Sequence, residues 1–230
     1  MVTAADLESE AFLRRFLLGR FPRDRFLGEE GGEHGGAAVR GRRRGGEPYL
    51  WAVDPLDGTV NFLHGHPFFA VSVALLDEGG PVVGAIEAPA LGWSYAAARG
   101  RGARRNGRPI RVSAVASLDG ALIGTGWPAA SHVRPGPFLR PLGPVLRATQ
   151  GARRCGSAAI DLALTADGTY DAHFERSLHT WDVAAGILLV REAGGRVTDH
   201  GGVEADASGR EILASNGLIH GAMLGVLRGG

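Results

Sequence analysis

The segment that most restricts the possible folds is WAVDPLDGT, residues 51–59, in which an apolar run of strand length ends in two aspartates. Pro55 disfavours helical backbone at Asp54 and presets a turn, so a buried strand has to end here. Gly58 permits backbone angles and close approaches that side chains forbid. The sequence therefore places Asp54 and Asp57 at the exit of a buried strand, where both side chains can converge on one point.

The chemistry of this turn suits a cation. Two carboxylates this close repel each other unless a cation or a proton lies between them. The carbonyl of Leu56 can face the same point, and a ligand set made only of oxygen suits Mg²⁺. Thr59 adds a hydroxyl at the start of a new element, whose free N–H groups can hold an anion. Taken alone, the segment can also be a capped turn in which Asp54 and Asp57 bind backbone N–H groups.

The pattern of apolar residues predicts mostly β structure in the first half of the chain, after one amphipathic helix. The short links between the apolar runs predict antiparallel neighbours, and Asn106-Gly107 predicts a hairpin turn. Thr3 or Asp6 can cap the first helix. The expected elements are a helix over 4–21, a mobile glycine- and charge-rich loop over 26–48, and strands over 49–54, 68–77, 81–90 and 92–99.

The second half alternates strands with helices. A serine cap and a closing glycine mark the helix over 156–168, and two glycines end the helix over 181–195. The other expected elements are strands over 121–126, 170–175, 196–199 and 211–215, a proline-rich loop over 127–144, and a final helix over 217–229. An antiparallel half followed by an alternating half predicts a mixed α/β (α+β) protein with helices outside the sheets.

Charge and cysteine content narrow the function classes. The 230 residues carry a net charge of only +1, which argues against a polyanion-binding surface. The basic run RGRRRGG, residues 40–46, is most often a solvated loop, and nucleic-acid contact is the alternative. Cys155 is the one cysteine, so no intramolecular disulfide can form, which fits a reducing cytoplasm. No apolar run reaches the ~18 residues needed to span a bilayer, and we expect no signal peptide.

Three further segments complete a family pattern: FLGEE at 26–30, RCGSAAIDLAL at 154–164 and HTWDVAAG at 179–186. Asp182 begins a helix, where the dipole favours a carboxylate, and a plain N-cap is the alternative. Together with WAVDPLDGTVNFLHGHPFFAVSVAL and WDVAAGILLVREAGGRVTD, these segments resemble the inositol monophosphatase family of Mg²⁺-dependent, lithium-sensitive phosphomonoesterases. The resemblance runs in order through essentially the whole chain.

The resemblance implies a layered αβαβα sandwich of the sugar-phosphatase type and a homodimer. The chain would be a single domain over 1–230, with an N-terminal α+β part over 1–112 that carries the metal site and a C-terminal α/β part over 113–230. Two or three Mg²⁺ ions would be held by Glu30, Asp54, the Leu56 carbonyl, Asp57 and Asp182. Glu29 and Glu33 would then be loop charges, although the glycine-rich surroundings leave this register open.

The same resemblance assigns catalytic and substrate roles. Thr59 would orient the attacking water, with Asp6 of VTAAD polarising it through that threonine and Asp57 taking part in catalysis. Water would attack phosphorus in line, activated by metal, with no phosphoenzyme. Substrate contacts would come from the following residues: Glu30, Leu56, Asp57, Gly58, Thr59, Ser157, Ala158, Ala159, Glu175 and Asp182. Glu175 could instead be a surface strand end.

Other readings stay open at this stage. His64, His66 and His179 are expected to be structural, because imidazole suits softer metals than Mg²⁺. The helix that precedes VTxxD in the family is absent, so we expect Asp6 to be frayed and catalytic efficiency and dimer packing to suffer. The substrate could be inositol 1-phosphate or a related polyol phosphate. It could also be histidinol phosphate, fructose 1,6-bisphosphate, NADP or a nucleotide 3′-phosphate.

A second class of function is non-catalytic binding to RNA or the transcription machinery. The residues that would support it are the basic run and nearby arginines: Arg40 to Arg44, Arg99, Arg101, Arg104 and Arg105. We regard nucleic-acid binding as the less favoured reading, and a small phosphorylated substrate as the favoured partner.

Overall fold

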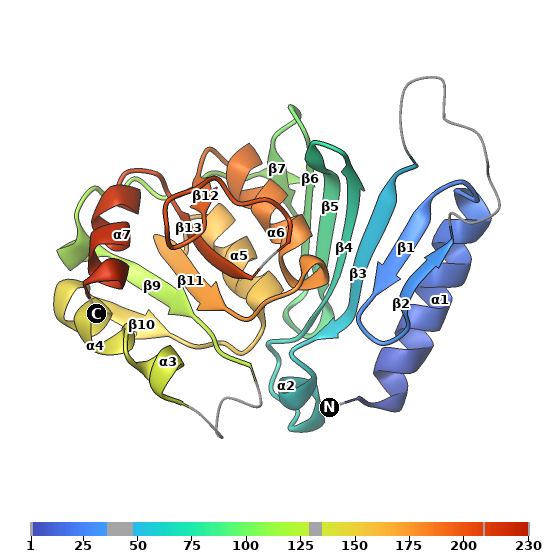
Figure 1. Ribbon diagram of the computed structural model, residues 1–230, viewed down its shortest axis with the longest axis horizontal. Coiled ribbons are helices and arrows are strands. Elements are labelled where there is room, and N and C mark those ends of the chain that lie inside the picture. Colours follow the sequence, from blue (N-terminus) through green and yellow to red (C-terminus); the bar gives the residue numbers. More distant parts are fainter. Residues whose placement is uncertain (1, 36–47, 129–134, 209, 230) are drawn as a thin grey trace.

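The computed structural model describes residues 2–35, 48–128, 135–208 and 210–229, which form two β-sheets interleaved with helices (Figure 1). The helices are α1 (Ala4–Arg20), α2 (Thr59–Leu63), α3 (Gly136–Leu139), α4 (Leu142–Ala148), α5 (Ala158–Ala166), α6 (Thr180–Glu192) and α7 (His220–Arg228), with short 3₁₀ turns at Pro89–Leu91 and Leu118–Gly120. Among the described residues, no helix is both long and apolar enough to cross a bilayer.

The larger sheet comes from the first half of the chain and has the strand order β2-β1-β3-β4-β5-β6-β7-β8. Its strands are β1 (Arg25–Gly28), β2 (Gly32–Gly35), β3 (Leu50–Asp57), β4 (Ala70–Asp77), β5 (Gly80–Ala88), β6 (Trp93–Ala98), β7 (Ala103–Arg105) and β8 (Arg108–Pro109). Neighbouring strands from β3 to β8 are antiparallel, whereas β1 and β3 are parallel. Asn106 and Gly107 have positive φ angles of 48° and 76°, and they form the expected β7–β8 hairpin turn.

The smaller sheet comes from the second half and has the order β10-β9-β11-β13-β12. Its strands are β9 (Leu122–Thr125), β10 (Gly151–Arg153), β11 (Ala172–Arg176), β12 (Arg196–Thr198) and β13 (Glu211–Ser215). β10, β9 and β11 run parallel, because helical segments connect them, and β13 and β12 join antiparallel. The expected alternation of strands and helices is confirmed in this half.

The helices and sheets form five layers (Figure 1). α1 covers the outer face of the large sheet, α5 and α6 fill the space between the sheets, and α4 and α7 cover the far face of the small sheet. Glycines bring the middle layers close: a Cβ on Gly84 would lie 2.9 Å from the Cα of Ala185, and one on Gly186 would lie 2.5 Å from the Leu162 side chain. The mixed α+β class expected from the sequence is confirmed, with helices both between and outside the sheets.

Two expected loops contain regular structure. Residues 25–35 form the β1–β2 hairpin, because backbone pairing of β1 with β3 outweighs the low strand propensity of this glycine-rich segment. In the proline-rich segment, Pro135 and Pro141 are the N-caps of α3 and α4, where proline interrupts no helical hydrogen bond. The remainder of the first loop, including Arg40 to Arg44, lies outside the described residues.

The expectation that Asp6 is frayed is wrong. Thr3 is the N-cap of α1, and its hydroxyl accepts hydrogen bonds from the N–H groups of Ala5 and Asp6. The Asp6 carboxylate accepts from the Thr3 N–H in return, which completes a capping box. Asp6 is fully buried, so this helix start holds the side chain in place.

Candidate active site

The exit of β3 has the geometry that its sequence predicts. β3 pairs with β4 through Asp54 and Ser72 and resumes at Asp57 and Ala70, so the register shifts over the Pro55-Leu56 step. Within this irregular step, Asp54 Oδ1 accepts a 2.9 Å hydrogen bond from the Leu56 N–H. The shift lets both carboxylates leave the strand toward the end of the sheet that faces α5 and α6.

Gly58 makes the next turn possible. Its φ of 89° lies in the left-handed region, and a Cβ would lie 2.8 Å from the carbonyl oxygen of Phe68. α2 begins at Thr59, whose Oγ1 lies 3.1 Å from the Leu56 carbonyl oxygen and 3.3 Å from Asp6 Oδ1. The single hydroxyl hydrogen serves one of these acceptors at a time. The structure thus brings together Thr59 and Asp6, which the sequence separates by more than fifty residues.

Asp57 is anchored by the start of α5. Ser157, the N-cap of that helix, donates a 2.6 Å hydrogen bond to Asp57 Oδ2, and the Ala159 N–H donates a second of 2.7 Å. The Ser157 oxygen also accepts from the Ile160 N–H. These groups hold Asp57 in place, and the expectation that Ser157, Ala158 and Ala159 contact substrate stays a prediction.

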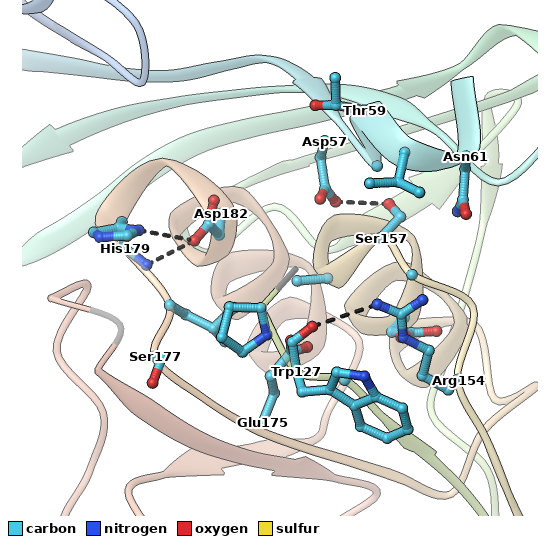
Figure 2. Close-up of a pocket in the computed structure, with 18 of the residues that line it drawn as sticks. Asp57, Thr59, Asn61, Trp127, Arg154, Ser157, Glu175, Ser177, His179 and Asp182 are labelled. Atoms are coloured by element: carbon cyan, nitrogen blue, oxygen red, sulfur yellow. Dashed lines mark hydrogen bonds and ion pairs between the residues drawn. The ribbon is translucent and has the colours of Figure 1, made fainter. Parts of the chain in front are cut away.

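A cavity of about 250 Å³ opens between β3, α2, α5, β11 and α6 (Figure 2). The following sequence-predicted residues line it: Asp57, Gly58, Thr59, Ser157, Ala158, Glu175, His179 and Asp182. Figure 2 shows Asp57 and Asp182 on neighbouring walls, with Glu175 below them. Asp54 is buried at the β3 exit, and Glu30, Leu56 and Ala159 are not in the cavity wall.

The predicted register of the GEE segment, Gly28 to Glu30, is corrected by the structure. Glu29 lines the cavity, and its carboxyl hydrogen-bonds that of Asp54. Glu30 does not line the cavity, and burial together with the charges of Asp6 and Glu10 raises its pKa. Glu29 is therefore the glutamate that joins Asp54, Asp57 and Asp182. The tight β1–β2 turn decides which of the two glutamates faces the cavity.

Glu10 of α1 holds this turn in place. Its carboxylate accepts hydrogen bonds of 2.8 Å from the Glu30 N–H and 2.9 Å from the Gly31 N–H. Glu10 is itself 3% exposed, so α1 presents a buried anion to the turn. Nothing in the spacing of α1 separates Glu10 from an ordinary solvent-facing glutamate, and we did not predict this role from the sequence.

The carboxyl groups at the cavity have pKa values raised by burial and by one another's charge. Burial, reinforced by Asp57, raises the pKa of Asp182 to about 8, although the His179 N–H opposes the shift with a 2.7 Å hydrogen bond. Burial raises the pKa of Asp57 to about 6 and that of Glu29 to about 7. Burial and the neighbouring carboxylates raise the pKa of Asp54 well above its usual value. Such shifts mean that the group cannot be fully ionised without a compensating cation.

The donor set fits a hard divalent cation. Glu29, Asp54, Asp57 and Asp182 supply carboxylate oxygens, the ligand type that Mg²⁺ accepts, and none of these four positions carries nitrogen or sulfur. Burial and the neighbouring carboxylates raise the pKa values of Asp54 and Asp182, as expected for closely spaced acids that a cation would stabilise. His64 and His66 are exposed. His179 lies at the cavity, where its ring stacks on Trp181 with 4.7 Å between centroids and its Nδ1 lies 3.5 Å from Asp182 Oδ2.

Several cavity residues were not predicted. Arg154 lines the cavity, where its guanidinium lies over the Trp127 ring at 5.2 Å and 3.4 Å from the Trp127 carbonyl oxygen. Asn61 donates to the carbonyls of Phe68 and Cys155 and so ties α2 to the α5 start. Asp161 lies at the cavity floor. The RCGSAA segment contained the only hint, a basic residue just before a helix start.

The fold and site define a five-layered α+β protein with a polycarboxylate cavity at the junction of its two sheets. The profile of the inositol monophosphatase family matches residues 1–228, and the chain belongs to that family. The resemblance seen in the sequence is thereby confirmed.

Individual relatives support the assignment to this family. The inositol-1-monophosphatase of Rhizobium meliloti is 44% identical over 228 residues, covering 99% of this chain and 82% of that protein. A putative Nus factor SuhB of Neisseria meningitidis serogroup B is 41% identical over 226 residues, covering 98% and 84%. The structure of an inositol monophosphatase from Anabaena superposes with a TM-score of 0.90 at 40% identity, covering 99% and 87%.

Proposed function

We propose that this protein is a Mg²⁺-dependent phosphatase that hydrolyses inositol 1-phosphate or a related polyol phosphate. The observation that carries the proposal is the convergence of four carboxyl groups, from β3, the β1–β2 turn and α6, at one cavity. A phosphate monoester is itself an anion, so it can enter such a cavity only together with cations.

In this proposal Glu29, Asp54, Asp57, Asp182 and the Leu56 carbonyl hold two or three Mg²⁺ ions. When bound, the ions would supply charge neutralisation for the phosphate and would lower the pKa of water at the site. Glu29 takes the place that the sequence suggested for Glu30, because Glu29 is the glutamate that lines the cavity.

The protein's own residues orient the water. When the Thr59 hydroxyl donates to Asp6 Oδ1, its oxygen lone pairs are directed by that bond and can accept a hydrogen bond from a water in the cavity. Asp6 is fully buried and its carboxylate accepts from the Thr3 N–H, so this acceptor is held in place before substrate arrives. We propose in-line attack of that water without a phosphoenzyme, and the free N–H groups of Gly58 and Thr59 as phosphate contacts.

The remaining cavity wall suits the alcohol part of the substrate. Glu175 is 7% exposed and faces the cavity, where its carboxylate can accept hydrogen bonds from sugar or polyol hydroxyls. Arg154 and the Ala158 backbone border the same space, and Arg154 offers a positive charge to the phosphate. The cavity accommodates a small polyol phosphate, and NADP stays an alternative substrate.

Several expectations remain predictions. These are lithium sensitivity, a homodimer, a cytoplasmic location and a single domain over 1–230. Histidinol phosphate, fructose 1,6-bisphosphate and nucleotide 3′-phosphates remain alternative substrates for the same chemistry.

A second candidate is a role in transcription, which the name Nus factor of several relatives favours. The structure offers it limited support, because Arg99 is paired with Asp77 through two 2.9 Å contacts and Arg105 is paired with Asp167 at 2.9 Å. Arg101 and Arg104 are exposed. Salt-sensitive RNA or polymerase binding that survives Asp57→Asn would establish this role.

The test of the phosphatase is a panel assay. Phosphate release is measured from about a dozen monoesters with Mg²⁺, with chelator, with added Li⁺ and with the Asp57→Asn variant. We expect turnover of at least one polyol phosphate that needs Mg²⁺ and that Asp57→Asn abolishes. Absence of turnover on every ester, with the protein folded and Mg²⁺ bound, would overturn the proposal.

A further inference from the structure

Beneath the cavity floor lies a second group of buried polar side chains that contains a histidine. Asp161 comes from α5, and His173 and Glu175 come from β11. His173 and Glu175 are two residues apart on the strand, so both point to the face that α5 covers, while Phe174 between them packs in the core on the other side. The exposed fractions are 1% for Asp161, 0% for His173 and 7% for Glu175.

The polar atoms of this group are unsatisfied. Both carboxylate oxygens of Asp161 and both ring nitrogens of His173 are buried, and none has a hydrogen-bond partner among the residues that the structure describes. Buried polar atoms without hydrogen-bond partners destabilise a fold and are rare in native proteins. Four orphaned atoms on two adjacent side chains indicate that something absent from the polypeptide completes the site.

The backbone of β9 leaves room for these side chains. β9 runs parallel to β11, with Gly124 opposite His173. A Cβ on Gly124 would lie 3.1 Å from His173 Nδ1, and a Cβ on Gly126 would lie 2.3 Å from either Glu175 carboxylate oxygen. Any larger residue at these two positions would displace the histidine or the glutamate, so the two glycines keep space for the group.

We propose that Asp161, His173 and Glu175 form a second metal site, which binds one divalent transition-metal ion such as Zn²⁺, Mn²⁺ or Co²⁺. One ligand atom from each residue can be chosen so that all three lie within 4.8 Å of one another. Ligands about 2.1 Å from a shared ion lie roughly 3.4–4.2 Å apart, so only a small side-chain contraction is needed. The proposal shares Glu175 with the proposed substrate wall, but its test measures metal binding and needs no phosphatase activity.

The ligand chemistry sets this site apart from the Mg²⁺ ligands. An imidazole nitrogen with two carboxylates suits Zn²⁺, Mn²⁺ or Co²⁺, whereas Mg²⁺ prefers oxygen alone. Two carboxylates and a neutral imidazole carry a charge of −2, which one divalent ion cancels. Asp161 and Glu175 also line the cavity, which gives the ion an entry path and leaves its remaining positions to water.

The competing arrangement is a protonated His173 between two carboxylates. His173 Nε2 lies 3.4 Å from Glu175 Oε2, but Nδ1 lies 3.9 Å from Asp161 Oδ2, which is too far for a hydrogen bond. An imidazolium would therefore leave Asp161 without a hydrogen bond from the ring. The experiment below decides between the ion and the imidazolium.

The test uses the full chain, stripped with chelator and returned to buffer with excess Mg²⁺. Co²⁺ is titrated in, and binding is followed by visible ligand-field absorption and by metal analysis after dialysis. We expect one equivalent of Co²⁺ to be retained despite the Mg²⁺, with a spectrum that indicates nitrogen coordination. Zn²⁺ should displace it and remove the colour.

Variants identify the ligands. His173→Gln and Asp161→Asn should each weaken binding of the retained Co²⁺ at least tenfold, with folding checked by circular dichroism. His200→Gln is the matched control, since His200 is also buried but is bonded to Arg176 and the Ile212 carbonyl, and Asp182→Asn should likewise keep the ion. The proposal is overturned if wild-type protein retains no Co²⁺ in excess Mg²⁺, or if the retained ion is indifferent to both ligand variants.

Discussion

Ser157, the N-cap of α5, donates a 2.6 Å hydrogen bond to Asp57 at the end of β3, across 100 residues of sequence. The bond joins the two halves of the chain at the cavity. It also means that the start of α5 binds a carboxylate of the protein itself.

Removing this hydroxyl should loosen Asp57. In Ser157→Ala we expect a loss of about 1 kcal/mol in the free energy of unfolding, since a helix cap is lost, and a roughly tenfold weaker Mg²⁺ affinity, as for other ligand-supporting groups. Thermal unfolding and Mg²⁺ titration measure the two effects. Ser117→Ala, at the exposed start of a 3₁₀ turn, is the control and should change neither. Equal Mg²⁺ affinity in both variants would contradict the anchoring role.

Glu29 and Glu30 form a matched pair. Glu29→Gln should lower kcat/KM by about 100-fold or more, because a lost ligand removes several kcal/mol of charge stabilisation. Glu30→Gln should stay within about threefold of wild type, since the Glu30 side chain does not line the cavity. Steady-state kinetics at saturating Mg²⁺ check both. The reverse ranking would return the ligand role to Glu30.

Glu10 should act on the site through the β1–β2 turn. Glu10→Ala leaves the N–H groups of Glu30 and Gly31 without their acceptor, so we expect a loss of about 1–3 kcal/mol in stability together with weaker Mg²⁺ binding through Glu29. Chemical denaturation and Mg²⁺ titration provide the measurements. Glu8→Ala, on the exposed face of the same helix, should be close to neutral.

Loss of the Thr59 hydroxyl should lower kcat more than it lowers Mg²⁺ affinity. Thr59→Ala should lower kcat by about 10- to 100-fold with little change in Mg²⁺ affinity, because Thr59 orients the water through its bond to Asp6. Thr59→Ser keeps the hydroxyl and should recover most of the rate. If the alanine and serine variants are equally slow, the hydroxyl has no such function and the methyl group matters instead.

The raised pKa values predict how metal-free stability depends on pH. Asp57, Glu29 and Asp182, with pKa values of about 6, 7 and 8, bind protons more tightly when folded than when unfolded. Their favourable contribution is complete below about pH 4 and is lost as pH rises toward 8. We expect the metal-free Tm to fall by at least about 5 °C between pH 5 and 8.

Saturating Mg²⁺ should reverse this trend, because the ion binds the ionised carboxylates. At about 100 times Kd it adds roughly 2.7 kcal/mol, and the increase in Tm should be largest at pH 8. Differential scanning calorimetry of both forms measures the effect. Asp182→Asn, which cannot ionise, should show a shallower fall in the metal-free state. A metal-free Tm that rises from pH 5 to 8 would refute the assignment of these groups as proton-holding carboxyls.

The sequence by itself determined the local structure wherever a short-range rule was decisive. Pro55 and Gly58 fixed the turn after β3, and Asn106-Gly107 fixed a hairpin. The strand β4 and the capped ends of α5 could also be predicted from local sequence. With the family pattern, these elements sufficed for the fold class and for Asp54, Asp57 and Asp182 as members of one acidic site.

Only the tertiary structure decided which neighbouring side chain faces the cavity and which groups meet across long separations. Whether Glu29 or Glu30 points inward depends on the β1–β2 turn and on its contact with Glu10, and a one-residue rotation there leaves the sequence pattern unchanged. The meeting of Asp161 with His173 depends on how α5 packs on β11. Side-chain direction at these positions depends on packing between distant segments. Local sequence spacing therefore cannot predict it.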